Sequence, residues 1–234
     1  MNKCLVLDKI KFEDWKAALL YAKQGQFMFS FDLKSGYHHI AIHKDFHSYL
    51  GFSWQFGNEV KYFQFTVLPF GLATAGHIFT KTVRCIVKYW RSLGLKIVVY
   101  LDDGLCFSDN FEDSNNQRKM VKSDLKKAGL VSKDIKSIWD STTNLIWLGI
   151  GVDLDEGTIY ITDKCIQAAL NLISSVLDRP RTTARKLARI TGKIVSMSLV
   201  FGNITNLMLK YSHMTIIDRI TWGGYFNVNK LVIE

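Results

Sequence analysis

The stretch KIVVYLDDGLCFS, residues 96–108, decides the fold of this sequence. Its first part is apolar and rich in β-branched residues, which is typical of a buried strand. Asp102, Asp103 and Gly104 have the chemistry of a turn, and apolar residues resume at Leu105. The pattern predicts a β-hairpin with two carboxylates at its tip. An isolated Asp-Asp-Gly is also consistent with a plain turn, so the surrounding sequence must decide between the two.

A third acid ends an alternating segment well upstream of this hairpin. In FMFSFDL, residues 27–33, the aromatic residues share one face of a strand, whereas Met28, Ser30 and Asp32 share the other. Residues 74–92 place apolar side chains at helical spacing and predict a long helix between the two strands. Strands joined in this way can lie side by side, which would gather three acids. Such acids could hold Mg²⁺, which prefers oxygen ligands, and a pair of ions serves in-line phosphoryl transfer.

The remaining patterns divide the chain into two parts. In chain order they predict a helix over 12–23, β-type runs near 38–43, 48–54 and 60–67, a polar helix over 110–128 and a hairpin over 145–162. Later segments are purely helical, over about 166–177, 183–199 and 203–217, with a break at Pro180. We therefore expect a domain boundary near residue 163, between an α+β domain and a small helical bundle.

Composition excludes several classes of protein. Of the 234 residues, 48% are apolar and 13% aromatic, so the chain is not predominantly disordered. It contains only two prolines, which excludes Pro-rich linkers. The net charge of +9 favours a polyanionic partner, with nucleic acid first and an anionic membrane surface second. An ordinary basic protein with no such partner is the open alternative.

The sequence predicts an intracellular protein, in the cytoplasm or nucleus, without a membrane partner. No run of about 18 apolar residues is present, so no spanning helix is expected. The first residues, MNKCLVLDKIKFEDW, become charged too early for a secretory signal. The cysteines form no CxxC pair, which argues against a zinc site or a disulfide framework and for a reducing compartment.

Two further groups of residues invite a functional interpretation. Four histidines, His38, His39, His43 and His47, have partly helical spacing, but their surroundings look extended, so we expect no shared metal site. Three basic residues recur every four positions in the tail, opposite an apolar stripe: Arg185, Arg189 and Lys193. Such a helix suits a phosphate backbone, although a solvated bundle face is the usual alternative.

Five segments, taken in order, resemble the palm motifs of reverse transcriptases. They are FSFDLKSGYHHIAIH (29–43), FTVLPFGLATAGHIFTKT (65–82), VVYLDDGLCFS (98–108), AGLVSKDIKS (128–137) and LIWLGIGVD (145–153). None is specific alone, whereas five in order are. The tail segment ARKLARITGKIVSMSLVFG, residues 184–202, resembles the thumb of the DIRS-like group of retrotransposons.

The resemblance implies an α+β fold: a right-hand polymerase palm over 1–162, followed by a small helical thumb over 163–234. The palm would be an antiparallel sheet with helices on one face. The implied activity is RNA-directed DNA synthesis, in which a dNTP is added to a primer 3′-hydroxyl on an RNA or DNA template. Two Mg²⁺ ions are the implied cofactors, which Mn²⁺ could replace.

Site residues follow from the resemblance, position by position. Asp32 and Asp102 match the acids that bind both ions, Asp103 matches the third acid, and the backbone carbonyl of Leu33 joins them.

Four more residues match positions around the nucleotide. Tyr37 stands at the steric-gate position that rejects a ribose 2′-hydroxyl, and its simpler interpretation is a strand aromatic. Phe70 and Gly71 match the pair beside the incoming nucleotide and template. Lys136 matches the lysine that protonates pyrophosphate, and an ordinary solvated lysine is equally consistent with the sequence.

The chain also departs from the family pattern. Reverse transcriptases carry a fingers region ahead of the first palm motif and an RNase H domain further on, and neither pattern is recognisable here. We therefore expect a fragment, or a decayed copy, of a longer polyprotein. The alternatives to a polymerase are a catalytically dead nucleic-acid-binding remnant of a retroelement and a basic structural protein.

Overall fold

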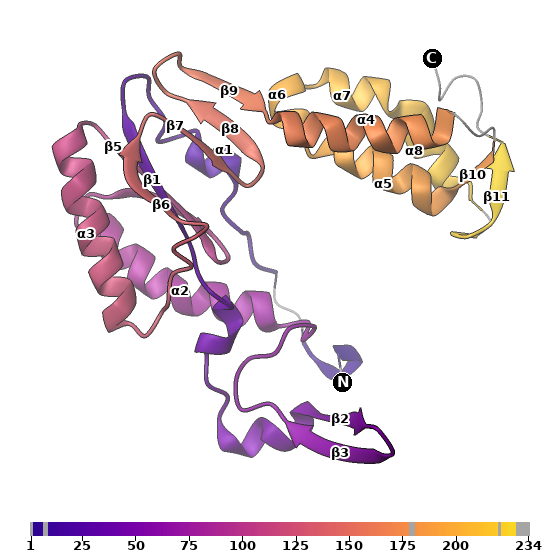
Figure 1. The fold of residues 1–234 in the computed structure, drawn as a ribbon, viewed down its shortest axis with the longest axis horizontal. Helices are drawn as coiled ribbons and strands as arrows, with labels where there is room; N and C mark the ends of the chain where they lie inside the picture. The colour runs from indigo at the N-terminus through magenta and orange to yellow at the C-terminus, as the bar shows by residue number, and fades with distance from the viewer. Residues whose placement is uncertain (1, 7–8, 178–180, 220, 228–234) are drawn as a thin grey trace. The chain divides into compact units, whose positions relative to one another are not determined.

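The computed structural model describes residues 2–6, 9–177, 181–219 and 221–227 (Figure 1). The chain forms two compact units: residues 1–145 with 154–157, and residues 146–153 with those from 158 onward. This division groups the strands β8 (Ile150–Asp153) and β9 (Thr158–Ile161) with the helices that follow, because β9 packs against the helix α6 (Ser198–Phe201). The sequence pattern assigns these strands to the first domain instead.

A four-stranded antiparallel sheet forms the centre of the first unit. Its spatial order is β4 (Lys96–Tyr100), β5 (Asp103–Ser108), β1 (Phe27–Asp32) and β6 (Ile138–Thr142). Two aromatic residues of β1, Phe29 and Phe31, lie deep in the core, and Phe29 is completely buried. The predicted strand and hairpin are therefore confirmed, and the strands that carry the acids are direct neighbours.

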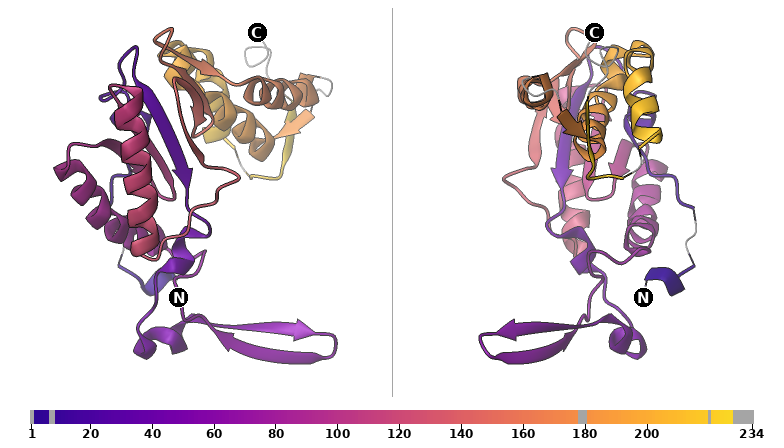
Figure 2. Two further views of the ribbon diagram at one scale, coloured as in Figure 1. Left: turned by 60° about the vertical axis from the view of Figure 1, so that its left-hand side comes forward. Right: turned by 90° about the vertical axis from the view of Figure 1, so that its right-hand side faces the viewer.

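Two long helices pack on one face of this sheet, as expected for a palm (Figures 1 and 2). They are α2 (Ala75–Ser92) and α3 (Phe111–Lys127). Phe79 and Trp90 from α2 join one hydrophobic core with Val121 from α3 and with Phe29 and Phe31 from β1. Since both phenylalanines point to the same face of β1, this face carries the main core of the unit.

The N-terminal helix is shorter than expected. In place of a helix over 12–23, α1 covers only Trp15–Ala18, and the Asp14 side chain caps it. The residue just before Asp14 is held against other elements. Glu13 binds Arg91 of α2 with both carboxylate oxygens, at 2.9 and 2.7 Å, and accepts the Val99 amide of β4 at 3.2 Å. These contacts remove the preceding residues from the helical path.

Between β1 and α2 the structure differs in part from the three β-type runs that the sequence predicts. Ser35 adopts a left-handed conformation, with φ 54°, and starts a 3₁₀ turn, η2 (Gly36–His39). A second 3₁₀ segment, η3 (Lys44–Leu50), follows, so no strand covers residues 38–43. The runs expected near 48–54 and 60–67 are confirmed, with shifted ends, as a separate antiparallel hairpin: β2 (Gly51–Phe56) and β3 (Glu59–Gln64). Figure 2 shows this exposed hairpin standing away from the central sheet.

The second unit combines two small sheets with helices, and its first strand, β7, begins two residues before the boundary at residue 146. Its elements, in chain order, are β7 (Asn144–Trp147), β8 (Ile150–Asp153), β9 (Thr158–Ile161), α4 (Asp163–Leu177), β10 (Arg181–Thr183), α5 (Ala184–Val195), α6 (Ser198–Phe201), α7 (Ile204–Met208), α8 (Lys210–Ile217) and β11 (Tyr225–Asn227). The helix α5 packs against α4, α7 and α8. The helix expected over 203–217 is interrupted at Leu209, and the one over 183–199 ends at Val195. Pro180, the expected break, lies outside the described residues.

Among the described residues, no helix has both the length and the apolar character needed to cross a membrane.

Candidate active site

Backbone pairing brings the three acids together. Asp32, the last residue of β1, is the register partner of Asp103, the first residue of β5. One residue further on, the Leu33 amide donates a hydrogen bond to the Asp102 carbonyl oxygen at 2.8 Å. Asp32 and Leu33 therefore lie beside the tip of the β4–β5 hairpin, as the sequence predicts.

The turn of this hairpin lies earlier than expected. Tyr100 pairs with Asp103, so the two turn residues are Leu101 and Asp102, and Leu101 has a φ of 53°. Gly104 is not a turn residue but a member of β5, opposite Phe31. A Cβ atom on Gly104 would lie 2.2 Å from the Phe31 ring, so the ring occupies the space of the missing side chain.

The segment 131–137, called here the Lys136 loop, wraps around the end of β1. The Lys34 amide donates to the Val131 carbonyl, and the Lys133 amide donates to the Asp32 carbonyl, at 2.8 and 2.7 Å. The Asp32 amide donates to the Ser137 hydroxyl at 3.1 Å. These bonds place the Lys136 ammonium 3.6 Å from the Asp32 carboxylate, whose side chain is 14% exposed.

Partial burial and mutual repulsion favour the protonated acids at the hairpin tip. The pKa of Asp103 is raised from 3.8 to about 6, first by desolvation and then by the charges of Asp102 and Asp32. The pKa of Asp102 is also raised, chiefly by desolvation, with Asp32 adding to the effect. Lys136 opposes both shifts. The site therefore holds an excess of negative charge that one lysine does not compensate.

Tyr37 lies between aromatic rings beside the acids. Its ring centroid is 4.9 Å from that of Phe70 and 5.3 Å from that of Phe79. Partial burial and the charge of Asp102 raise the pKa of its hydroxyl, in that order, which shows that Tyr37 is close to the hairpin tip. Phe70 is exposed, and Gly71 follows it with a φ of 84°. Tyr37 and Phe70 are therefore direct neighbours.

Asn2 holds the loop that carries Phe70 and Gly71. The sequence pattern does not predict this role of Asn2. Its side-chain amide donates to the Gly71 carbonyl at 2.8 Å and accepts from the Ala73 amide at 3.0 Å. An open pocket of about 280 Å³ borders this contact. No local pattern signals a contact between residues so far apart in sequence.

Residues 5–152 match the family model of reverse transcriptase (RNA-dependent DNA polymerase). This match covers more than half of the chain. The chain belongs to the reverse transcriptase family.

Viral polyproteins are among the relatives of this reverse transcriptase domain. It is 30% identical over 158 residues to the genome polyprotein of Petunia vein clearing virus (isolate Shepherd), covering 68% of this chain and 7% of the polyprotein. It is 29% identical over 160 residues to the enzymatic polyprotein of Cauliflower mosaic virus (strain Strasbourg), covering 68% of this chain and 22% of the polyprotein. The chain thus spans less than a quarter of these relatives.

Solved structures share the fold. The foamy viral protease-reverse transcriptase in complex with double-stranded DNA matches 98% of this chain and 37% of its own, with a TM-score of 0.76 and 19% identity. The same viral protein in complex with an RNA/DNA hybrid matches 97% of this chain and 28% of its own, with a TM-score of 0.73 and 19% identity. At this identity the likeness concerns the fold, which is that of a reverse transcriptase polymerase.

The acid cluster of the reverse transcriptase domain fits a divalent metal ion in its chemistry. Reverse transcriptases use such ions. Within the described residues, no three carboxylate, imidazole or thiolate groups gather closely enough to hold an ion unaided. Mg²⁺ commonly binds through one or two carboxylates, with water and substrate phosphates completing its shell. Asp32, Asp102 and Asp103 repel one another, and a bound cation would relieve this repulsion.

The raised pKa of Asp103 predicts a dependence of stability on pH. Its pKa is 3.8 when unperturbed and about 6 in the fold. Between these values the folded state binds more protons than the unfolded state, so stability falls as pH rises through this window. Urea unfolding of Asp103→Asn should show a smaller fall between about pH 4 and about pH 7 than wild type. Asp218→Asn, at an exposed aspartate, is the control, and an identical fall in all three proteins would contradict the prediction.

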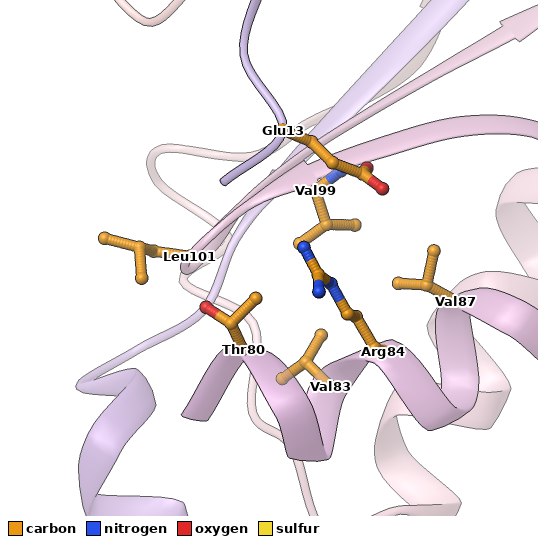
Figure 3. A pocket seen from close by; sticks show the side chains of 7 residues that line it. All are labelled: Glu13, Thr80, Val83, Arg84, Val87, Val99 and Leu101. Carbon is orange, nitrogen blue, oxygen red and sulfur yellow. The ribbon is translucent and has the colours of Figure 1, made fainter. Parts of the chain in front are cut away.

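A small pocket behind the hairpin is too small to hold a substrate (Figure 3). It lies between α2, β4 and Glu13, with Leu101 at its border, and its volume is about 10 Å³. A space of this size holds about one water molecule. The Thr80 hydroxyl in its wall is buried and finds no hydrogen-bond partner in the part of the chain that the structure describes, so water is the occupant that its chemistry suits.

The basic stripe of α5 is not uniform. Arg185 and Arg189 are exposed, whereas the Lys193 ammonium donates to the Cys165 sulfur of α4 at 2.8 Å in a partly buried contact. Contact of the stripe with nucleic acid stays a prediction.

The four histidines make separate local contacts. His39 binds backbone groups of Gly36 and Val131, and His47 faces the Ile42 carbonyl. His43 accepts the Asp45 amide, and the His38 ring lies against Phe70.

Proposed function

We propose that this chain is the polymerase part of a reverse transcriptase and adds dNTPs to a primer 3′-hydroxyl on an RNA or DNA template. The observation that supports it is the meeting of Asp32, Asp103 and the Asp102 turn, with Lys136 at 3.6 Å from Asp32. In this proposal residues 1–162 act as the palm and residues 163–234 as the thumb.

The proposed cofactors are two Mg²⁺ ions, or Mn²⁺ in their place. Asp32, Asp102, Asp103 and the carbonyl of Leu33 would hold them. When bound, they activate the primer hydroxyl and stabilise the leaving pyrophosphate. The carboxylates supply position and charge rather than nucleophilic power, and backbone pairing at two strand ends and a turn fixes where they begin.

The other proposed residues act on the nucleotide. Lys136 would donate its ammonium proton to the pyrophosphate oxygen, and its approach to Asp32 places it at the same end of the sheet. Phe70 and Gly71 would border the nucleotide base and the template.

Tyr37 is proposed as the steric gate, because its ring is held between Phe70 and Phe79 near Asp102. Tyr37→Val removes the ring and should raise the use of ribonucleotides by about tenfold or more, as the loss of a steric contact worth 1–3 kcal/mol would do. The ratio of kcat/KM values for a dNTP and the matching NTP measures this. Tyr62→Val, at an exposed tyrosine of β3, is the control. An unchanged ratio would assign Tyr37 to packing alone.

The context of the domain is also proposed. The thumb-like segment 184–202 supports a DIRS-like retrotransposon as its source, and fingers and RNase H parts of a longer polyprotein are its expected companions. An intracellular location, in cytoplasm or nucleus, would follow from such an element.

Primer extension tests the proposal. The purified chain, an RNA template, a DNA primer, dNTPs and Mg²⁺ or Mn²⁺ should give a product longer than the primer. Binding of the primer–template without any extension, at high dNTP and metal, would favour the nucleic-acid-binding remnant instead. If the chain neither binds the primer–template nor extends the primer, the reverse transcriptase proposal loses its support.

The arginines of α5 should set the salt dependence of nucleic-acid binding. Each phosphate contact makes the slope of log K against log salt more negative by about 0.9, so the loss of a contact reduces its magnitude by that amount. Arg185→Ala with Arg189→Ala should therefore reduce the slope by up to about 2, measured by fluorescence anisotropy on a duplex, and adding Lys193→Ala should reduce it by up to about 3 in total. Lys210→Ala, in α8, is the single-charge control. An unchanged slope in the triple variant would mean that the stripe is only solvated surface.

A further inference from the structure

His39 uses both ring nitrogens to bind backbone groups. The Val131 amide lies 3.1 Å from Nε2, and a backbone N–H can only donate, so Nε2 is the acceptor. The ring proton therefore belongs on Nδ1, which donates to the Gly36 carbonyl oxygen at 3.1 Å. The two contacts require a neutral imidazole in one tautomer, because a protonated ring would offer no acceptor to Val131.

The two partners of His39 belong to the two sides of the acid cluster. Gly36 is buried, and a Cβ atom on it would lie 3.3 Å from the Asp102 Cβ and 2.8 Å from the Phe79 ring. The backbone of the η2 turn is thus packed directly against Asp102.

Val131 is the first residue of the Lys136 loop. Its carbonyl accepts from Lys34, next to Leu33, and its amide is held by His39. The same loop places Lys136 at 3.6 Å from Asp32.

We infer that His39 is a positioning residue that joins the η2 turn beside Asp102 to the Lys136 loop and so holds Lys136 opposite Asp32. It makes no contact with reacting atoms. Its part in catalysis rests on the proposed polymerase function, whereas its part in loop order does not.

Two conservative variants separate the two bonds of His39. An Asn amide can place a donor near Nδ1, whereas the longer Gln side chain can place an acceptor near Nε2. His39→Gln therefore keeps an acceptor for Val131, His39→Asn keeps only the donor to Gly36, and His39→Ala keeps neither. His47→Ala is the matched control, since His47 contacts only the Ile42 carbonyl among the hydrogen bonds of the described residues.

Nuclear magnetic resonance of the full chain provides the test that is independent of activity. In wild type, the ¹⁵N shifts of His39 should show the Nδ1–H tautomer. Hydrogen exchange of the Val131 amide should rise by roughly fivefold in His39→Ala and His39→Asn, the effect of losing one hydrogen bond. It should stay at the wild-type rate in His39→Gln and His47→Ala. An Nε2–H tautomer, or equal exchange in all four variants, would overturn the inference.

Primer extension then tests the catalytic consequence. His39→Ala and His39→Asn should lower kcat by about tenfold, as loss of a supporting contact behind a metal site commonly does, with the KM for dNTP unchanged. His39→Gln should restore most of the loss. If wild type does not extend primers, the proposed function fails while the exchange data still decide the role of His39. Normal kcat in His39→Asn, with fast Val131 exchange, would overturn the catalytic part.

Discussion

Asp102→Asn abolishes primer extension and leaves duplex binding within about twofold of wild type; this is the expected result if the acid cluster works by holding metal. The amide is a poor ligand for a hard cation, so the loss should be complete rather than partial. Asparagine has the shape of aspartate, and the bond from the Leu33 amide goes to the backbone carbonyl of residue 102. The turn should therefore keep its geometry.

Stability distinguishes lost chemistry from lost structure in this variant. Because burial and Asp32 raise the pKa of Asp102, removing its charge should not lower the stability at neutral pH. The measurements are gel-resolved extension, fluorescence anisotropy with a primer–template, and urea unfolding, with Asp218→Asn as the matched substitution at an exposed position. Extension by Asp102→Asn at the wild-type rate would mean that the metal-site assignment is wrong.

Gly104→Ala is expected to destabilise the first unit by about 2–3 kcal/mol, the upper part of the range for overpacking a core. The new Cβ atom would lie 2.2 Å from the Phe31 ring. That ring cannot move easily, since it is stacked on Trp139 at 5.9 Å and meets the edge of Trp90 at 6.2 Å. The clash also lies next to Asp103, so activity should fall together with stability.

Urea unfolding measures this effect, and a second glycine provides the comparison. Gly51→Ala places its Cβ atom 3.7 Å from the nearest atom, an ordinary contact, and should change stability by less than about 1 kcal/mol. In a double-mutant cycle, Phe31→Leu should recover part of the cost of Gly104→Ala, because it removes the ring that the methyl group meets. Additive costs would show that the two residues do not compete for space.

The sequence predicted the elements whose pattern is periodic. The alternation of β1 and the four-residue spacing of α2 both reflect a single buried face, and the structure buries those faces in one core. The pairing of β1 with β5 could also be expected, because three acids near strand ends gain meaning only if the strands are neighbours.

Two of the failures arise where residues far apart in sequence come into contact. The helix at 12–23 was overestimated because Glu13 is drawn to Arg91 and Val99. The strand at 38–43 was wrong because Ser35 turns the chain and His39 binds Val131. Periodicity describes which face is buried, and it does not describe which partner a polar side chain finds.

The left-handed Leu101 restricts how the hairpin can change during evolution. A left-handed backbone costs an ordinary residue about 1–2 kcal/mol, and a residue branched at Cβ suffers more. Neutral drift at position 101 should therefore favour glycine or side chains that are not branched at Cβ, such as the present leucine, and disfavour valine, isoleucine and threonine. This filter acts through the backbone alone, between Tyr100 and Asp102. The range of residues found at this position in related domains should therefore reflect the left-handed backbone of the turn.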